Sequence, residues 1–147
     1  MNIKSRKKNS GLALLEVVLA IVILAILASL ILPRIVRLTD NKNSKVMIDN
    51  IADIGAAAAS WKGANTSYTG ISMTELTTTT NLLDASWGTG SGVNPVGGNY
   101  TAAASGNNLV ITSTGLSTGL CEVTKKKLSG NVISAACATG TLTVTMP

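Results

Sequence analysis

The chain has 147 residues, of which 46% are hydrophobic, and carries a net charge of +5 without any histidine or phenylalanine. The absence of histidine excludes a histidine-based catalytic triad and a histidine metal site. The basic excess lies at the start, because residues 1–11 hold four basic side chains and no acid. The remaining residues carry eight basic and seven acidic side chains, so +1, which argues against a nucleic-acid-binding protein.

An apolar run follows the basic leader and extends from Leu12 to Leu32. A helix of about 20 residues spans a bilayer, so the run is long enough to do so. The basic flank in front of it is expected in the cytoplasm by the positive-inside rule. Glu16 interrupts the run, and a charge at the centre of a membrane helix costs roughly 2.5–3.5 kcal/mol on insertion scales.

Three interpretations of residues 1–32 compete. A secretory signal peptide has an apolar region of about 7–15 residues followed by small residues, whereas this run is longer and contains a charge. A plain membrane anchor fits the length but leaves Glu16 unexplained. In the third interpretation the chain is cut between Gly11 and Leu12, and the run stays in the mature protein.

The residues around this cut resemble a known processing signature. A basic leader ending in Gly11, an apolar Leu12 and an acid at Glu16, the fifth position after the cut, resemble the prepilin signature of type IV pilins and pseudopilins. Pro33 is similar to a proline in the same helix of many such pilins, and Leu12 in place of phenylalanine resembles the type IVb branch. The resemblance implies cleavage after Gly11 by a prepilin peptidase and N-methylation of Leu12.

Cleavage would place a free α-amine on Leu12, one helical turn from Glu16. When helices of adjacent subunits bundle in a low-dielectric environment, this amine and this carboxylate can pair and set the axial register of a filament. The alternative is a glutamate that snorkels to the membrane interface near the end of the helix.

Helical periodicity resumes after a polar interruption at residues 39–44. One apolar stripe consists of Met47, Ile51, Ile54, Ala58 and Trp61. The spacing predicts an amphipathic helix that packs on a sheet and stops near Gly63. We therefore expect one long, interrupted helix from Leu12 to Lys62, kinked or loosened by Pro33 where it leaves the membrane.

The next segment is predicted to be mostly loop. Ser72 and Glu75 form a capping-box pattern, which predicts a short helix to about Asp84. Residues 88–100 are dense in glycine and lack a phosphate-binding P-loop pattern, so we expect a surface loop. Its Asn94-Pro95-x-Gly-Gly segment is similar to one in type IVb pilins.

The C-terminal part is predicted to contain strands and one helix. The expected strands are Tyr100–Ala104, Asn108–Ser113, Thr141–Met146 and a short one at Val132–Ile133. A hairpin turn is expected at residues 105–107. A helix over Ser117–Leu128 has Ser117 as its candidate cap and three lysines near its end, where the helix dipole favours them.

Cys121 and Cys137 lie beyond the apolar run, in a compartment expected to be oxidising, so a disulfide is the natural interpretation. A loop of about 16 residues makes it worth roughly 3 kcal/mol in the chain-entropy model. The resemblance implies that Glu122–Ala136 is a variable, surface-exposed region. Lys125–Lys127 would then form a solvated patch or, alternatively, adhere to an anionic surface or DNA.

The sequence predicts an α+β fold of the type IV pilin kind, with a long N-terminal helix packed on an antiparallel sheet. The expected parts are a cleaved leader at 1–11, a membrane and filament-core helix at 12–33, an amphipathic helix at 34–62 and a head at 63–147 with a disulfide loop over 121–137. No catalytic residue, cofactor or metal is expected, since Asp49 and Asp53 lie on a solvated helix face and the hydroxyl side chains lack a base.

The resemblance implies a structural subunit that polymerises with itself into a helical filament. Its expected partners are the membrane, the prepilin peptidase, the inner-membrane assembly machinery, and a host-surface, cell-surface or DNA ligand that the sequence does not define. It would reside in the inner membrane before assembly and in an extracellular pilus afterwards. The alternatives are a minor pilin, a type II secretion pseudopilin, or a single-pass periplasmic binding protein that never polymerises.

Overall fold

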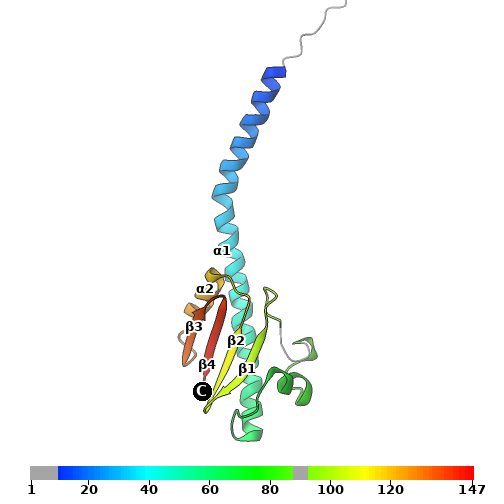
Figure 1. The fold of residues 1–147 in the computed structure, drawn as a ribbon, viewed down its shortest axis with the longest axis vertical. Helices are drawn as coiled ribbons and strands as arrows, with labels where there is room; N and C mark the ends of the chain where they lie inside the picture. The colour runs from blue at the N-terminus through cyan, green and yellow to red at the C-terminus, as the bar shows by residue number, and fades with distance from the viewer. Residues whose placement is uncertain (1–9, 88–92) are drawn as a thin grey trace, which may run out of the picture. The chain divides into compact units, whose positions relative to one another are not determined.

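The computed structural model describes residues 10–87 and 93–147, so the leader apart from its last two residues and the first five residues of the glycine-dense stretch lie outside the described residues (Figure 1). The chain divides into two compact units, Met1–Leu38 and Thr39–Pro147, and we call the second unit the head. The elements in chain order are α1 (Ser10–Asn65), η1 (Glu75–Thr79), η2 (Ala85–Trp87), β1 (Tyr100–Ser105), β2 (Asn108–Ser113), α2 (Thr118–Leu128), β3 (Ser134–Ala138) and β4 (Thr141–Met146).

The helix α1 is longer and more continuous than the sequence predicts. It runs unbroken through Pro33 and through the polar residues 39–44, where we expected an interruption. Ser44 in this segment is fully buried, which shows that packing within the head overrides its weak helix propensity.

The end of α1 also differs from the predicted stop at Gly63. The helix continues to Asn65, whose side-chain amide donates a hydrogen bond to the Trp61 carbonyl (3.0 Å). Thr66 then adopts a left-handed φ of 64°, and its N–H donates to the Lys62 carbonyl (2.7 Å). A threonine therefore takes the left-handed position that glycine commonly occupies after a helix.

Four strands form one antiparallel sheet in the order β1-β2-β4-β3. The predicted hairpin is present: Ser105 pairs with Asn108 around a two-residue turn in which Gly106 has a φ of 60°. The predicted strand at Val132–Ile133 is wrong, because the chain is still turning after α2 there and β3 begins at Ser134.

The core of the head lies between the second half of α1 and one face of the sheet. The predicted stripe on α1 is confirmed, since all five of its residues are buried. They meet alternate residues of the two central strands, Leu109, Ile111, Leu142 and Val144, which are each 1% exposed or less. A Cβ on Gly55 would lie 3.1 Å from the sulfur of Met146, so this glycine permits the helix to approach β4 closely. The predicted α+β architecture is therefore confirmed.

The helix predicted from Ser72 to Asp84 is much shorter in the structure. The Ser72 hydroxyl accepts a hydrogen bond from the Glu75 N–H (3.2 Å), as the capping pattern predicts, but the helical turn ends at Thr79. Threonine hydroxyls in this turn donate to nearby backbone carbonyls, for example Thr77 to Met73 (2.8 Å). Such local bonds compete with helix propagation, which explains the early end.

Asn94 organises the turn that leads into β1. It is 3% exposed, and its carboxamide oxygen accepts from the N–H groups of Val96 (3.1 Å) and Gly98 (2.9 Å). Its amide nitrogen donates to the Ser113 hydroxyl (2.9 Å). A Cβ on Gly98 would lie 1.9 Å from the Thr114 carbonyl oxygen, so only glycine fits there. The Asn-Pro-x-Gly-Gly pattern thus has a structural role.

Candidate processing and assembly site

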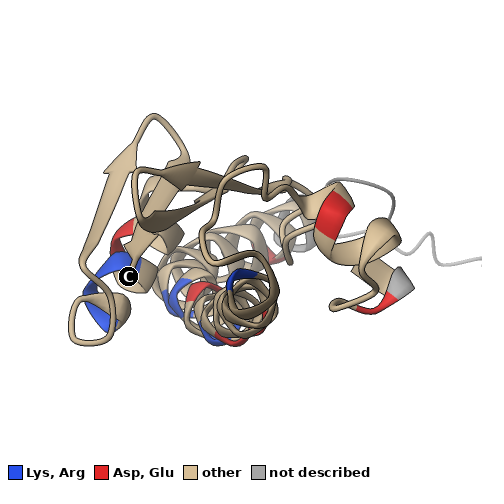
Figure 2. Cartoon of the chain, turned by 90° about the horizontal axis from the view of Figure 1, so that it is seen from below, with Lys and Arg blue, Asp and Glu red and all other residues tan. Residues whose placement is uncertain are grey.

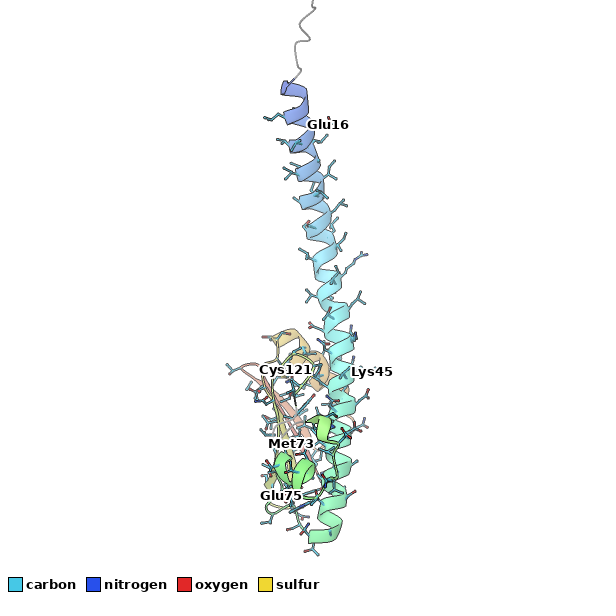
Figure 3. All side chains as sticks on the ribbon, turned by 90° about the vertical axis from the view of Figure 1, so that its right-hand side faces the viewer. Glu16, Lys45, Met73, Glu75 and Cys121 are labelled. Atoms are coloured by element: carbon cyan, nitrogen blue, oxygen red, sulfur yellow. A yellow bond between two sulfur atoms is a disulfide. The ribbon has the colours of Figure 1, made fainter. Side chains whose placement is uncertain are left out.

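The first part of α1 exposes nearly all of its apolar side chains. From Leu14 to Leu38 the large aliphatic residues are 48–70% exposed, and an 18-residue window there has a mean hydropathy of 3.0 with none of it buried. Figure 3 shows these side chains projecting away from the helix on all sides. By length and composition this helix can cross a membrane.

Gly11 and Leu12 lie in the first turns of α1, and their side chains lie outside the described residues. Glu16 is exposed on the helix, four residues after Leu12, so the two positions share one face and are separated by about 6 Å along the axis. Among the residues that the structure describes, none forms a hydrogen bond or ion pair with Glu16. Glu16 is therefore a carboxylate in an apolar surface, without a polar partner in the part of its own chain that the structure describes.

The exposed apolar surface continues beyond Pro33. Ile35, Val36 and Leu38 are 52–70% exposed, and they alternate with Arg34 and Arg37, the first charges after the run. At the end of the run, the Ser29 hydroxyl donates to the Ile26 carbonyl (2.7 Å). The first compact unit ends at Leu38, so the apolar surface of this unit reaches past the helix boundary that we placed at 33.

Cys121 on α2 and Cys137 on β3 are joined by a disulfide with a Cα–Cα distance of 6.0 Å. The bond connects α2 to β3, an edge strand of the sheet. The segment between the cysteines is only partly a surface region, because Thr124 (0% exposed) and Leu128 (4%) belong to the core. The expectation that all of Glu122–Ala136 is exposed is therefore wrong, since one face of α2 packs inward.

The predicted cap of α2 is present: the Ser117 hydroxyl accepts from the Leu120 N–H (3.2 Å). Among the lysines at the other end, Lys126 is exposed, Lys125 lies 3.2 Å from a carboxylate oxygen of Glu122, and Lys127 donates to Asn41 (3.4 Å). These cations form a basic patch in the last turn of α2.

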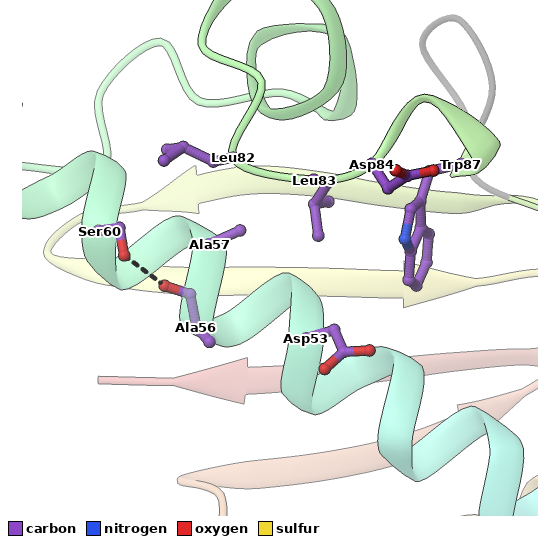
Figure 4. A pocket seen from close by; sticks show the side chains of 8 residues that line it. All are labelled: Asp53, Ala56, Ala57, Ser60, Leu82, Leu83, Asp84 and Trp87. Atoms are coloured by element: carbon purple, nitrogen blue, oxygen red, sulfur yellow. Dashed lines mark hydrogen bonds between the residues drawn. The ribbon is translucent and has the colours of Figure 1, made fainter.

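The sequence did not reveal a groove between α1 and the segment that contains η2. It has a volume of about 390 Å³ and is lined by residues of both elements, including Asp53, Ala57, Leu83, Asp84 and Trp87 (Figure 4). No local motif indicates it, because Asp53 and Asp84 are far apart in the sequence. Within the described residues, no group of three or more histidine, cysteine, aspartate or glutamate side chains could hold a metal ion.

Residues 6–32 match the family model of the prokaryotic N-terminal methylation motif. No curated protein matches the chain, and no solved structure matches it. The motif covers the basic flank and the apolar run, and the head has the α+β arrangement typical of the pilin fold. The motif supports a type IV pilin-like or pseudopilin-like precursor, and the apolar first part of α1 fits anchoring in a membrane.

Proposed function

We propose that the chain is a structural subunit of a type IV pilus of the type IVb branch. The observation that carries the proposal is the exposed apolar surface of α1 from Leu14 to Leu38, which contains Glu16 and overlaps the methylation motif. Soluble monomers rarely expose contiguous apolar patches of more than a few hundred Å². The surface therefore needs lipid or other helices around it.

A subunit of this kind uses the same surface in two environments. Lipid tails are about as apolar as leucine side chains, so moving the helix from the membrane into a bundle of identical helices changes its hydrophobic burial little. Packing and polar contacts then decide when assembly occurs. Glu16 is the polar group available for this role, because it is exposed and unpaired among the described residues.

In the proposed filament, Glu16 of one copy pairs with the α-amine of Leu12 of a neighbouring copy. Cleavage between Gly11 and Leu12 creates this amine, and methylation of Leu12 leaves it cationic. The two groups lie four residues apart on α1, so their pairing requires an axial shift of about 6 Å between the copies. The pairing gives the buried carboxylate a partner and fixes the register of adjacent helices.

The proposed location follows from the charges and the disulfide. The basic leader stays in the cytoplasm, the apolar helix spans the inner membrane once, and the head lies outside the cytoplasm. An oxidising compartment accounts for the bond between Cys121 and Cys137. After assembly the head lies on the surface of an extracellular filament, where it adheres, aggregates cells or supports conjugation.

Mass spectrometry of the membrane and sheared-surface fractions tests the proposal. We expect a mature chain that begins at Leu12 with one methyl group on its amine. A Gly11→Val variant serves as the control, since it should remain uncut and absent from the surface. An uncut Met1, or any N-terminus other than Leu12, would contradict the processing step.

Electron microscopy of the sheared fraction then tests the bulk role. As a principal subunit, the chain should account for most of the protein mass of the filaments. A mature chain that is present only in trace amounts relative to another filament protein would instead identify a minor pilin or a pseudopilin.

A further inference from the structure

The groove between α1 and η2 presents an acidic face. Asp53 and Asp84 both line it, and neither has an ion-pair partner among the residues that the structure describes. Asp84 accepts a hydrogen bond from the Ser86 N–H (2.8 Å), which holds its carboxylate in place and lowers its pKa. Trp87 forms part of the wall and packs on Tyr100 with ring centroids 6.0 Å apart.

Within the described residues, no lysine or arginine forms an ion pair with these carboxylates. The sequence has no lysine or arginine between Lys62 and Lys125. Lys62 itself lies over the ring of Tyr68, with its ammonium 4.5 Å from the ring centroid. The groove thus combines negative charge with an aromatic wall, which suits an ammonium group on an aliphatic stem.

A second surface of the head has the opposite character. Lys125 and Lys126 border a hollow of about 480 Å³ that also includes Val123 and Ala135. Glu122 lines it too and pairs with Lys125, so Lys126 is the lysine of this hollow with no ion-pair partner among the described residues. Ile133, which precedes β3, is 57% exposed. The hollow therefore places lysine ammonium groups beside the apolar side chains of Val123 and Ala135.

The two surfaces lie on opposite sides of the head. Figures 1 and 2 place α2 with its basic residues on one side of α1, and the segment of η1 and η2 with its acidic residues on the other. The residues from Thr39 to Pro147 carry six basic and six acidic side chains, so the head is neutral overall but polarised. Two different, complementary surfaces on one molecule join copies head to tail, which gives a ring if the rotation closes and an open chain if it does not.

We propose that the lysines at the end of α2 of one copy enter the Asp53–Asp84–Trp87 groove of a neighbouring copy of the same chain. The contact is heterologous: each copy donates lysines on one side and receives them on the other. Apolar side chains beside the charges, Val123 on one surface and Leu83 on the other, exclude water from the contact.

The geometry also sets the stagger of the two copies. Lys127 lies at the level of Asn41 on α1, whereas the groove lies at the level of Asp53, twelve residues further along the helix. At 1.5 Å per residue the donating copy is displaced by about 18 Å along the α1 axis, in the direction from Ser10 to Asn65. This neighbour is therefore a different copy from the one joined through Glu16 and Leu12, for which the shift is about 6 Å. A repeated contact with this displacement advances along an axis, as a filament requires.

This inference rests on the proposed function, because it needs a filament, and carbodiimide cross-linking of intact sheared filaments tests it. The reagent joins an ammonium to a carboxylate only where the two are in contact. In the dimer band we expect peptides that connect Lys125–Lys127 to Asp53 or Asp84. A dimer band without such peptides, or lysines joined to a different protein, would overturn the inference.

Charge reversal provides the second measurement. Asp53→Lys or Lys126→Glu alone should reduce filament yield about tenfold, and the combined variant should recover to within about threefold of the unaltered chain, because opposite charges meet again. Asp49→Lys is the matched control, since Asp49 is exposed one turn away and does not line the groove. Equal yields for Asp53→Lys and Asp49→Lys, or no recovery in the combined variant, would overturn the inference.

Different results refute the groove contact and the role as a pilus subunit. Normal filaments from the unaltered chain and from Asp53→Lys refute the groove contact and leave the pilus role intact. An unaltered chain that is absent from any filament refutes the proposed function, and this outcome is visible before any variant is made.

Discussion

The two halves of α1 show how one helix can serve two surroundings. Between Leu14 and Leu38 the apolar side chains point to every side and are exposed, whereas between Met47 and Trp61 only one stripe is apolar and it is buried. The first half is apolar all round, as expected for a helix surrounded by lipid or by other helices. The second half is amphipathic and carries the sheet. The comparison predicts that the stability of the head and the assembly of the proposed filament depend on separate residues of one element.

The largest expected effect comes from removing the only charge of the first half before Arg34. Glu16→Ala should abolish filaments while leaving cleavage, methylation and head stability unchanged, because Glu16 forms no hydrogen bond or ion pair with a described residue of its own chain. Electron microscopy of the sheared fraction and mass spectrometry of the membrane fraction measure the two effects. Glu16→Asp is the control that keeps the charge. Normal filaments from the alanine variant would refute the pairing role.

Matched truncations sharpen the comparison between the two halves. Ile54→Ala should lower the free energy of unfolding of the head by about 2–5 kcal/mol, since Ile54 is 0% exposed and the truncation leaves a cavity. Ile23→Ala, at a position 49% exposed, should leave that free energy unchanged. Urea unfolding of the mature chain in detergent, followed by the fluorescence of Trp61 and Trp87 in the head, measures both. Equal destabilisation by the two variants would mean that the halves are energetically coupled.

The same contrast explains what the sequence could predict. Features set by local patterns are found correctly: the apolar stripe, the Ser117 cap, and the bounds of β2 and β4. Predictions fail where contacts distant in sequence decide. The polar residues 39–44 stay helical although their local propensity indicated a break, because Ser44 packs into the head and Asn41 accepts a hydrogen bond from Lys127.

The groove between α1 and η2 shows why a site built from distant segments cannot be predicted from local sequence patterns. Asp53 was identified only as an acid on a solvated helix face, and Asp84 only as the expected end of a short helix. Their approach depends on how the chain from Gly63 to Trp87 folds back onto α1, and no local pattern specifies that path. The prepilin signature, in contrast, is contiguous and could be read directly.

The disulfide provides the next smaller effect and lies entirely in the head. Changing both Cys121 and Cys137 to alanine should lower the free energy of unfolding by about 3 kcal/mol, because the unfolded chain regains the entropy of a 16-residue loop. Urea unfolding with and without reductant measures the effect, and the alanine variant should no longer respond to reductant. Membrane insertion of the first half of α1 should be unchanged, which fractionation can check.

The smallest effect concerns the boundary between the stripe of α1 and the sheet. Tyr100 is fully buried, accepts a hydrogen bond from Asn50 (3.3 Å), and has its pKa raised to about 12 chiefly because burial disfavours the phenolate. The unfolded chain loses this proton near pH 10 while the folded chain keeps it, so stability is complete below about pH 10 and falls as pH rises to about 12. One pH unit of this window corresponds to about 1.4 kcal/mol. The free energy of unfolding in urea should therefore fall more between pH 9 and pH 11 for the unaltered chain than for Tyr100→Phe, which lacks the titrating group. An equal fall for both chains would show that other groups cause the alkaline loss of stability.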